Sequence, residues 1–118
     1  MKEKLYRYVD KPWGSETWVA VNEHYALKII KLSKGSRTSL QYHNQKVEDI
    51  YLWSGLISAE EETADHQMVT TVYKPGEVMH NPTGFKHRLT ALEDSTFVEV
   101  STPFLDDVVR VADDYHRQ

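Results

Sequence analysis

Hydrophobic and polar positions alternate along most of the chain, in short runs rich in β-branched and aromatic residues. Such runs are typical of half-buried β-strands, and they occupy residues 25–33, 39–43, 49–58, 67–74, 87–92 and 96–101. Clusters of Gly, Pro, Asn and Asp favour tight reversals between them, at residues 34–36, 59–65, 74–76 and 81–84. Many short strands at this spacing predict an all-β sandwich or barrel.

The end of the chain has a different pattern. Thr102 and Pro103 end the last predicted strand, and Asp106 and Asp107 are suited to cap a short helix within residues 105–115. No linker, low-complexity tract or fixed repeat interrupts the sequence. With 118 residues, of which 40% are hydrophobic, the chain is expected to form one domain, residues 1–118, around one core.

Charge and composition exclude several classes of protein. The formal net charge is −4, with 14 basic and 18 acidic residues spread along the chain, so no basic stripe suits a nucleic acid. No apolar run approaches the roughly 20 residues of a membrane span, and no secretion signal is visible. We therefore expect a soluble cytoplasmic protein. Cysteine is absent, so any metal must be held by nitrogen and oxygen atoms.

Four residues form a candidate metal site. If residues 39–43 are a strand, Ser39, Gln41 and His43 project from one face. Glu48 follows a polar bend, and His87 begins a separate strand. Two imidazoles, a carboxylate and an amide oxygen suit zinc, iron, manganese, cobalt or nickel. Each residue alone is as well explained by an ordinary half-buried or solvated position, so it is their joint spacing that favours a site.

That spacing resembles the two motifs of the cupin superfamily. In the first motif, residues 35–55, Gln41 stands where the first histidine is usual, and His43 and Glu48 follow at the motif's positions. In the second motif, residues 76–91, His87 has its expected place, and alanine replaces the usual final asparagine. The resemblance implies a cupin jelly-roll barrel of six to eight strands that encloses one divalent metal ion and is commonly paired as a homodimer.

A closer resemblance is to the small cupin domain of type II phosphomannose isomerases. The strand at 39–43 looks like their SLQ-x-H motif, residues 11–16 resemble a KPWG-x-E opening, and residues 106–117 resemble their DDIVR and DxYGR ending, with His116 in place of glycine. The resemblance covers about nine tenths of the chain. It implies zinc bound by Gln41, His43, Glu48 and His87, and interconversion of mannose 6-phosphate and fructose 6-phosphate.

Four further residues are candidates for contact with a sugar phosphate. Lys46, near the proposed cation, is expected to have a lowered pKa and to carry a proton or contact phosphate, unless it is a solvated turn lysine. Arg110 is expected to bind phosphate, unless it pairs with a nearby aspartate. Lys28 would reach into the barrel, unless its strand has a wet face. Ser39 shares the face of Gln41 and is expected to contact substrate.

The remaining candidates are weaker. Strand parity turns Lys86 and Arg88 away from the metal, and we interpret both as surface or interface charges. His80 could face the cavity, but no motif includes it. The three tryptophans are more consistent with core or dimer contacts than with sugar stacking, and they are Trp13, Trp18 and Trp53.

Two other classes of function remain open. One is a different cupin enzyme, such as an iron dioxygenase or a nucleotide-sugar epimerase, the latter using a His-Asp pair without metal. The other is a non-catalytic module that binds metal and sugar, because type II isomerases are usually fused to a nucleotidyltransferase that this sequence lacks. The fold alone does not choose among them.

Overall fold

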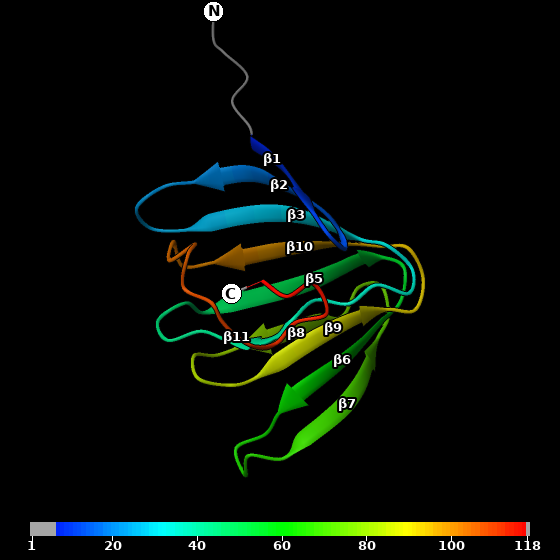
Figure 1. The fold of residues 1–118 in the computed structure, drawn as a ribbon. Helices are drawn as coiled ribbons and strands as arrows, with labels where there is room; N and C mark the ends of the chain where they lie inside the picture. Colours follow the sequence, from blue (N-terminus) through cyan, green and yellow to red (C-terminus); the bar gives the residue numbers. More distant parts are fainter. Residues whose placement is uncertain (1–6, 118) are drawn as a thin grey trace, which may run out of the picture.

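The computed structural model describes residues 7–117, which form two antiparallel sheets and no helix. The six-stranded sheet has the order β1-β2-β3-β10-β5-β8 (Figure 1). Its strands are β1 (Arg7–Lys11), β2 (Gly14–Val21), β3 (Ala26–Leu32), β10 (Ser95–Ser101), β5 (Glu48–Ser54) and β8 (Val78–Asn81). Alternate residues of β3, β5 and β10 are buried, which is the period-two pattern that the sequence predicts.

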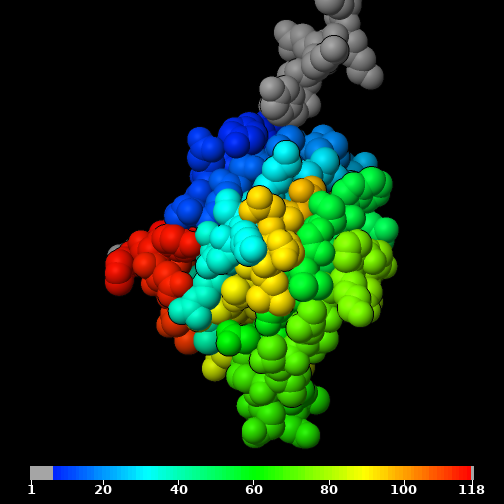
Figure 2. Space-filling model, turned by 90° about the vertical axis from the view of Figure 1, so that its right-hand side faces the viewer, coloured from blue at the N-terminus to red at the C-terminus, as the bar shows by residue number. Residues whose placement is uncertain are grey.

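The five-stranded sheet has the order β11-β4-β9-β6-β7. Its strands are β11 (Val109–Ala112), β4 (Leu40–Tyr42), β9 (His87–Ala91), β6 (Ile57–Glu62) and β7 (Met68–Tyr73). The hairpin of β6 and β7 protrudes from the body of the molecule, at the bottom of Figure 2. The described residues contain no apolar helix of the length needed to cross a bilayer.

Both sheets contribute to one hydrophobic core. Ile30, Leu52 and Phe97 come from the six-stranded sheet, and Ile57 and Leu89 from the other. All five are nearly inaccessible to solvent, so they remove a large apolar area from water. This core fills one end of the space between the sheets and leaves the other end to polar residues.

Two predicted boundaries were wrong. The run 49–58 is divided between β5 and β6 by a turn at Gly55, whose φ of 98° favours glycine. A Cβ there would also collide with Ser95. The polar stretch that begins at residue 59 is not a turn at its start, because residues 59–62 belong to β6 and pair with β7 and β9.

The predicted C-terminal helix was also wrong. Residues 109–112 form β11, which pairs with β4. The run Val108-Val109-Arg110-Val111 is rich in β-branched residues, which favour a strand. Asp107 does accept backbone N–H groups as a cap would, but from residues 44–46 in another segment. The C-terminal segment thus lies beside the loop that precedes β5, as the red trace in Figure 1 shows.

Candidate metal centre

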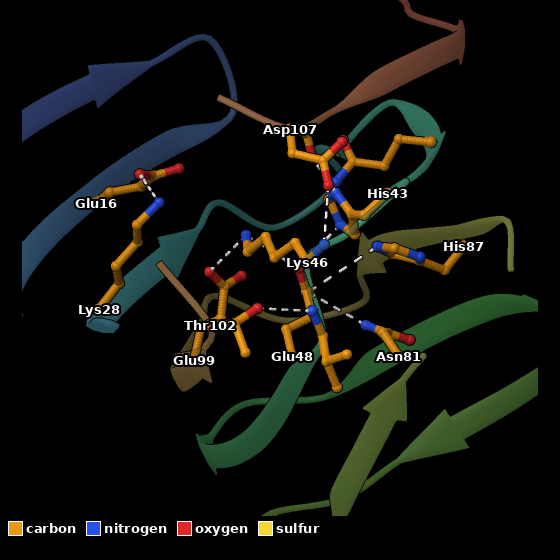
Figure 3. A network of polar contacts seen from close by, with 12 residues as sticks. Glu16, Lys28, His43, Lys46, Glu48, Asn81, His87, Glu99, Thr102 and Asp107 are labelled. Atoms are coloured by element: carbon orange, nitrogen blue, oxygen red, sulfur yellow. Dashed lines mark hydrogen bonds and ion pairs between the residues drawn. The ribbon is translucent and has the colours of Figure 1, made fainter. Parts of the chain in front are cut away.

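Three side chains from separate elements converge inside the molecule. His43 follows β4, Glu48 begins β5 and His87 begins β9, and all three are buried. One ligand atom from each lies within 4.8 Å of the others, and the two imidazole centroids are 5.2 Å apart. Figure 3 shows these side chains facing one another. A divalent ion needs a donor cluster of this size.

Both histidines present the same nitrogen to this cluster. The Nδ1 atom of His43 lies 2.6 Å from the carbonyl oxygen of Asp107, and that of His87 lies 3.2 Å from the carbonyl oxygen of Phe85. A carbonyl only accepts, so in each ring Nδ1 carries the hydrogen and Nε2 keeps its lone pair. Imidazoles held in this way are ready to coordinate a metal through Nε2.

The atoms at the centre of the cluster lack hydrogen-bond partners. His43 Nε2 and Glu48 Oε1 lie 3.0 Å apart, but not in hydrogen-bonding geometry, and His87 Nε2 is likewise unsatisfied. Buried polar atoms without partners are costly, and binding of an ion is one recognised way of satisfying them. The donor set of two imidazole nitrogens and a carboxylate therefore fits a divalent metal ion.

Glu48 is fixed and ionised by its neighbours. Its direct cross-strand partner, Asn81, donates a hydrogen bond of 3.2 Å to Oε2, and Lys46 Nζ lies 3.1 Å from Oε1. Burial opposes ionisation, but the contact with His43 and the charge of Lys46 outweigh it and lower the pKa of Glu48. The carboxylate is thus charged at neutral pH, as a metal ligand must be.

The two imidazoles differ in electrostatics. Burial lowers the pKa of His87, which favours the neutral form that coordinates metal. Burial acts in the same direction on His43, but the contact with Glu48 and the carbonyl of Asp107 outweigh it and raise the pKa of His43.

Gln41 lies beside the cluster. It pairs directly with His87 across β4 and β9, so the two side chains project from the same face, and both line one cavity of about 490 Å³. The hydroxyl of Ser39 donates a 2.6 Å hydrogen bond to Gln41 Oε1. An amide oxygen has a second lone pair, so Gln41 keeps an acceptor site.

Ser39 does not take the position expected of a substrate contact. It is completely buried and is absent from the residues that line the cavity. Its hydroxyl is engaged by Gln41. Ser39 therefore orients Gln41 through this hydrogen bond and does not face the cavity, in contrast to the substrate contact expected from sequence.

Lys46 is buried between two carboxylates. Its Nζ lies 3.1 Å from Glu48 Oε1 and 3.3 Å from Glu99 Oε2 (Figure 3). Burial disfavours the ammonium form, but Glu99 and Glu48 outweigh burial and raise the pKa of Lys46. The two carboxylates thus raise the pKa of Lys46, whereas the sequence led us to expect a lowered pKa. Lys46 therefore stays a charged hydrogen-bond donor.

Lys28 points inward and lines the cavity. It is buried in the middle of β3, which excludes the alternative of a wet strand face. Its Nζ lies 3.4 Å from Glu16 Oε1 and 4.7 Å from the ring centroid of Trp18. Trp18 and Trp13 line the cavity too, and Trp13 also belongs to the core, as expected.

Arg110 lines the same cavity from β11, opposite Gln41. Burial and the nearby Arg117 lower the pKa of Arg110, against the opposing charge of Asp113. Two nearby aspartates also bind other arginines: Asp113 accepts from Arg117, and Asp114 accepts from Arg37.

Two other interpretations needed correction. Arg88 does point away from the cavity lining, but it is buried, and its guanidinium donates to the carbonyl oxygens of Thr38 and Ala112. It therefore ties the segments around β9 together and is not a surface charge. His80 lies on the outside, where it contacts Asp49.

The roles of three residues at the site were not predicted from sequence, and these residues are Asn81, Glu99 and Asp107. Glu99 had a detectable signal, because it shares strand parity with the buried Phe97 and Ser101. Asn81 acts through its pairing with Glu48, and Asp107 through its contacts with residues 43–46. Neither relation follows from spacing along the chain.

Comparisons with known proteins agree with this architecture. Residues 1–113 match the family described as mannose-6-phosphate isomerase C-terminal. A search of curated proteins found no match. Among solved structures, KdgF from Halomonas sp. superposes with a TM-score of 0.74 at 22% identity, over 85% of this chain and 90% of KdgF.

Two larger proteins contain a similar fold. A variant of oxalate decarboxylase OxdC from Bacillus subtilis has a TM-score of 0.80 and 18% identity over 90% of this chain, which spans only 30% of that protein. CapF has a TM-score of 0.77 and 16% identity over 92% of this chain, which spans 35% of CapF. At these identities the likeness establishes the fold alone. Together with the family match and the buried histidine-carboxylate cluster, it shows that this chain is a cupin and belongs to the mannose-6-phosphate isomerase C-terminal family.

Proposed function

We propose that this protein is a metal-dependent isomerase of sugar phosphates that interconverts mannose 6-phosphate and fructose 6-phosphate. The observation that carries the proposal is the buried cluster of His43, Glu48 and His87 on the wall of a cavity of about 490 Å³. The family match supports the choice of substrate. We take zinc as the metal and Gln41 as the fourth ligand.

Each group on the cavity wall has a task in this proposal. A bound divalent ion would supply Lewis-acid stabilisation of the negative charge that develops on the sugar oxygen. Lys46, held as an ammonium between two carboxylates, donates hydrogen bonds to the same oxygens. Lys28 and Arg110 line the cavity from opposite sheets and hold the phosphate group.

The geometry gives little support to a metal-free epimerase that uses a histidine-aspartate pair. His43 contacts Asp107 through the backbone carbonyl of that residue, and not through its carboxylate. The side-chain pair of His80 and Asp49 is largely exposed on the opposite face of the sheet. Neither arrangement provides a buried catalytic pair.

We also propose that the protein is a homodimer. Tyr51, Trp53 and Val78 are exposed on the outer face of the six-stranded sheet, and the rings of Tyr51 and Trp53 lie 6.3 Å apart. Exposed aromatic side chains of this kind are enriched in protein interfaces.

The test of the activity is a coupled assay that follows fructose 6-phosphate formation from mannose 6-phosphate. Purified protein is stripped with a chelator and then reloaded separately with zinc, manganese, cobalt or iron. We expect turnover only after reloading, and none in a matched His87→Gln variant. Absence of turnover with every metal, despite stoichiometric metal binding and tight sugar binding, would favour a non-catalytic module.

A further inference from the structure

Glu99 is a buried carboxylate in the wall of the cavity, and the metal cluster does not use it. It lies on β10, between β3 and β5, and only 7% of its surface is exposed. Its side chain lines the same cavity as His43 and His87. An acidic residue is rarely buried to this extent unless it has a partner or a function.

Lys46 separates Glu99 from the metal cluster. Lys46 Nζ lies between Glu99 Oε2, at 3.3 Å, and Glu48 Oε1, at 3.1 Å. The hydrogen bond and the ion pair of Glu99 are both with this lysine. Figure 3 shows Lys46 between Glu99 and Glu48, so a sugar bound at the cluster that reached past the ammonium group would meet Glu99.

Of the other four carboxylates of the wall, Asp106 is exposed to solvent, and the remaining three have other partners. Glu16 contacts Lys11, Lys28 and the indole N–H of Trp18. Asp107 accepts three backbone N–H groups. Glu48 faces the imidazoles, and Lys46, as a charged ammonium, has no lone pair to accept a proton.

We propose that Glu99 is the catalytic base that carries the proton between C1 and C2 of the bound sugar phosphate, an assignment that rests on the isomerase function proposed above. In the aldose-to-ketose direction, the carboxylate takes the proton from C2 as the C1–C2 double bond of an enediolate forms. It then returns this proton to C1. The hydroxyl proton moves from O2 to O1, so the atoms balance and no oxidant or reductant is consumed.

The electrostatic surroundings of Glu99 suit this task. Burial is the main cause that raises the pKa of Glu99 to about 7, and Glu48 and Glu16 act in the same direction, while Lys46 and Lys28 oppose them. A base with a pKa near the working pH is both sufficiently ionised and sufficiently basic. Lys28, its direct cross-strand neighbour, is held by Glu16 at 3.4 Å.

The test compares the wild-type protein with Glu99→Gln in heavy water. Transfer of solvent deuterium to the sugar carbon is followed by NMR, together with kcat, KM and bound metal. We expect kcat and deuterium incorporation to fall about 10²- to 10⁴-fold in Glu99→Gln, with the bound metal unchanged and KM altered far less. Glu93→Gln, at an exposed ion pair with Lys34, is the matched control and should behave as wild type.

A second variant guards against misfolding. Glu99→Asp keeps a carboxylate and should recover part of kcat, and the acidic limb of the kcat/KM profile should shift in this variant relative to the wild type. If Glu99→Gln keeps more than a tenth of the wild-type kcat and exchange, the assignment of Glu99 is wrong while the isomerase proposal stands. If metal-loaded wild-type protein neither isomerises nor exchanges, both proposals fail.

Discussion

Histidines contact carboxylates in two contrasting regions of this molecule. Inside the cavity, His43 and Glu48 are almost completely buried, and the facing atoms have no hydrogen-bond partner. On the outer face, His80 and Asp49 make a shorter contact of 2.6 Å, but their side chains are 75% and 52% exposed. Solvent can satisfy the outer pair, whereas the inner cluster needs a further partner. Burial and unsatisfied atoms, and not short distance, therefore identify the functional site.

The largest expected effect comes from removing an inner imidazole. His87→Ala should weaken zinc binding by more than about 100-fold, because loss of a direct ligand exceeds the loss seen for supporting residues. The outer His80→Ala should leave zinc binding unchanged. Calorimetric titration of both chelated variants measures the difference, and equal affinities would remove the contrast between the two regions.

A smaller effect is expected from a residue that only supports the cluster. Asn81→Ala removes the hydrogen bond to Glu48 Oε2 and should reduce zinc affinity about 10- to 100-fold. Asn44→Ala is the control, because Asn44 is exposed and donates to Asp107 through its backbone N–H. If the zinc affinities of the two variants differ by less than threefold, or roughly 0.7 kcal/mol, Asn81 does not position Glu48.

The inner carboxylate Glu99 should make the metal-free protein sensitive to pH. The folded protein holds this proton more tightly than the unfolded chain, because the pKa of about 7 lies above the ordinary 4.5. The stabilisation is complete below pH 4.5 and is lost as pH rises through 7. Relative to Glu99→Gln, the free energy of unfolding of the wild type should fall by on the order of 3 kcal/mol across this window. Urea unfolding in chelator measures it, and parallel curves would contradict it.

The smallest effect on the fold is expected on the outer face. Trp53 is 67% exposed, so Trp53→Ser should change the free energy of unfolding of the monomer by less than about 0.5 kcal/mol. The same change should lower the dimer fraction in light scattering after size-exclusion chromatography. A wild-type protein that is monomeric at high concentration would refute the proposed homodimer.

The joint spacing of the ligands in two separate motifs, and not any single residue, predicted the inner cluster. His43 and Glu48 are close along the chain, and His87 begins a predicted strand. Lys28 lies on the same face of its strand as Ala26 and Ile30, which are buried. For His43 and Lys28 the side-chain direction follows from strand parity. Strand parity also indicates an inward direction for Glu99, but no motif includes this residue.

The supporting residues could not be predicted in the same way. Asn81 reaches Glu48 only because β5 and β8 pair in one particular register, and register depends on packing of the whole sheet. Asp107 was assigned to cap a helix that does not form. Its capping chemistry was correct, but the N–H groups that it binds lie more than 60 residues earlier.

The central claim is that His43, Glu48 and His87 hold one divalent ion inside the cavity. The most direct test is a crystal structure of zinc-loaded protein with anomalous diffraction at the metal edge. We predict one strong peak about 2.0–2.2 Å from both Nε2 atoms and from a Glu48 oxygen. A cavity without a peak, or a peak only at His80 and Asp49 on the outer face, would contradict the account.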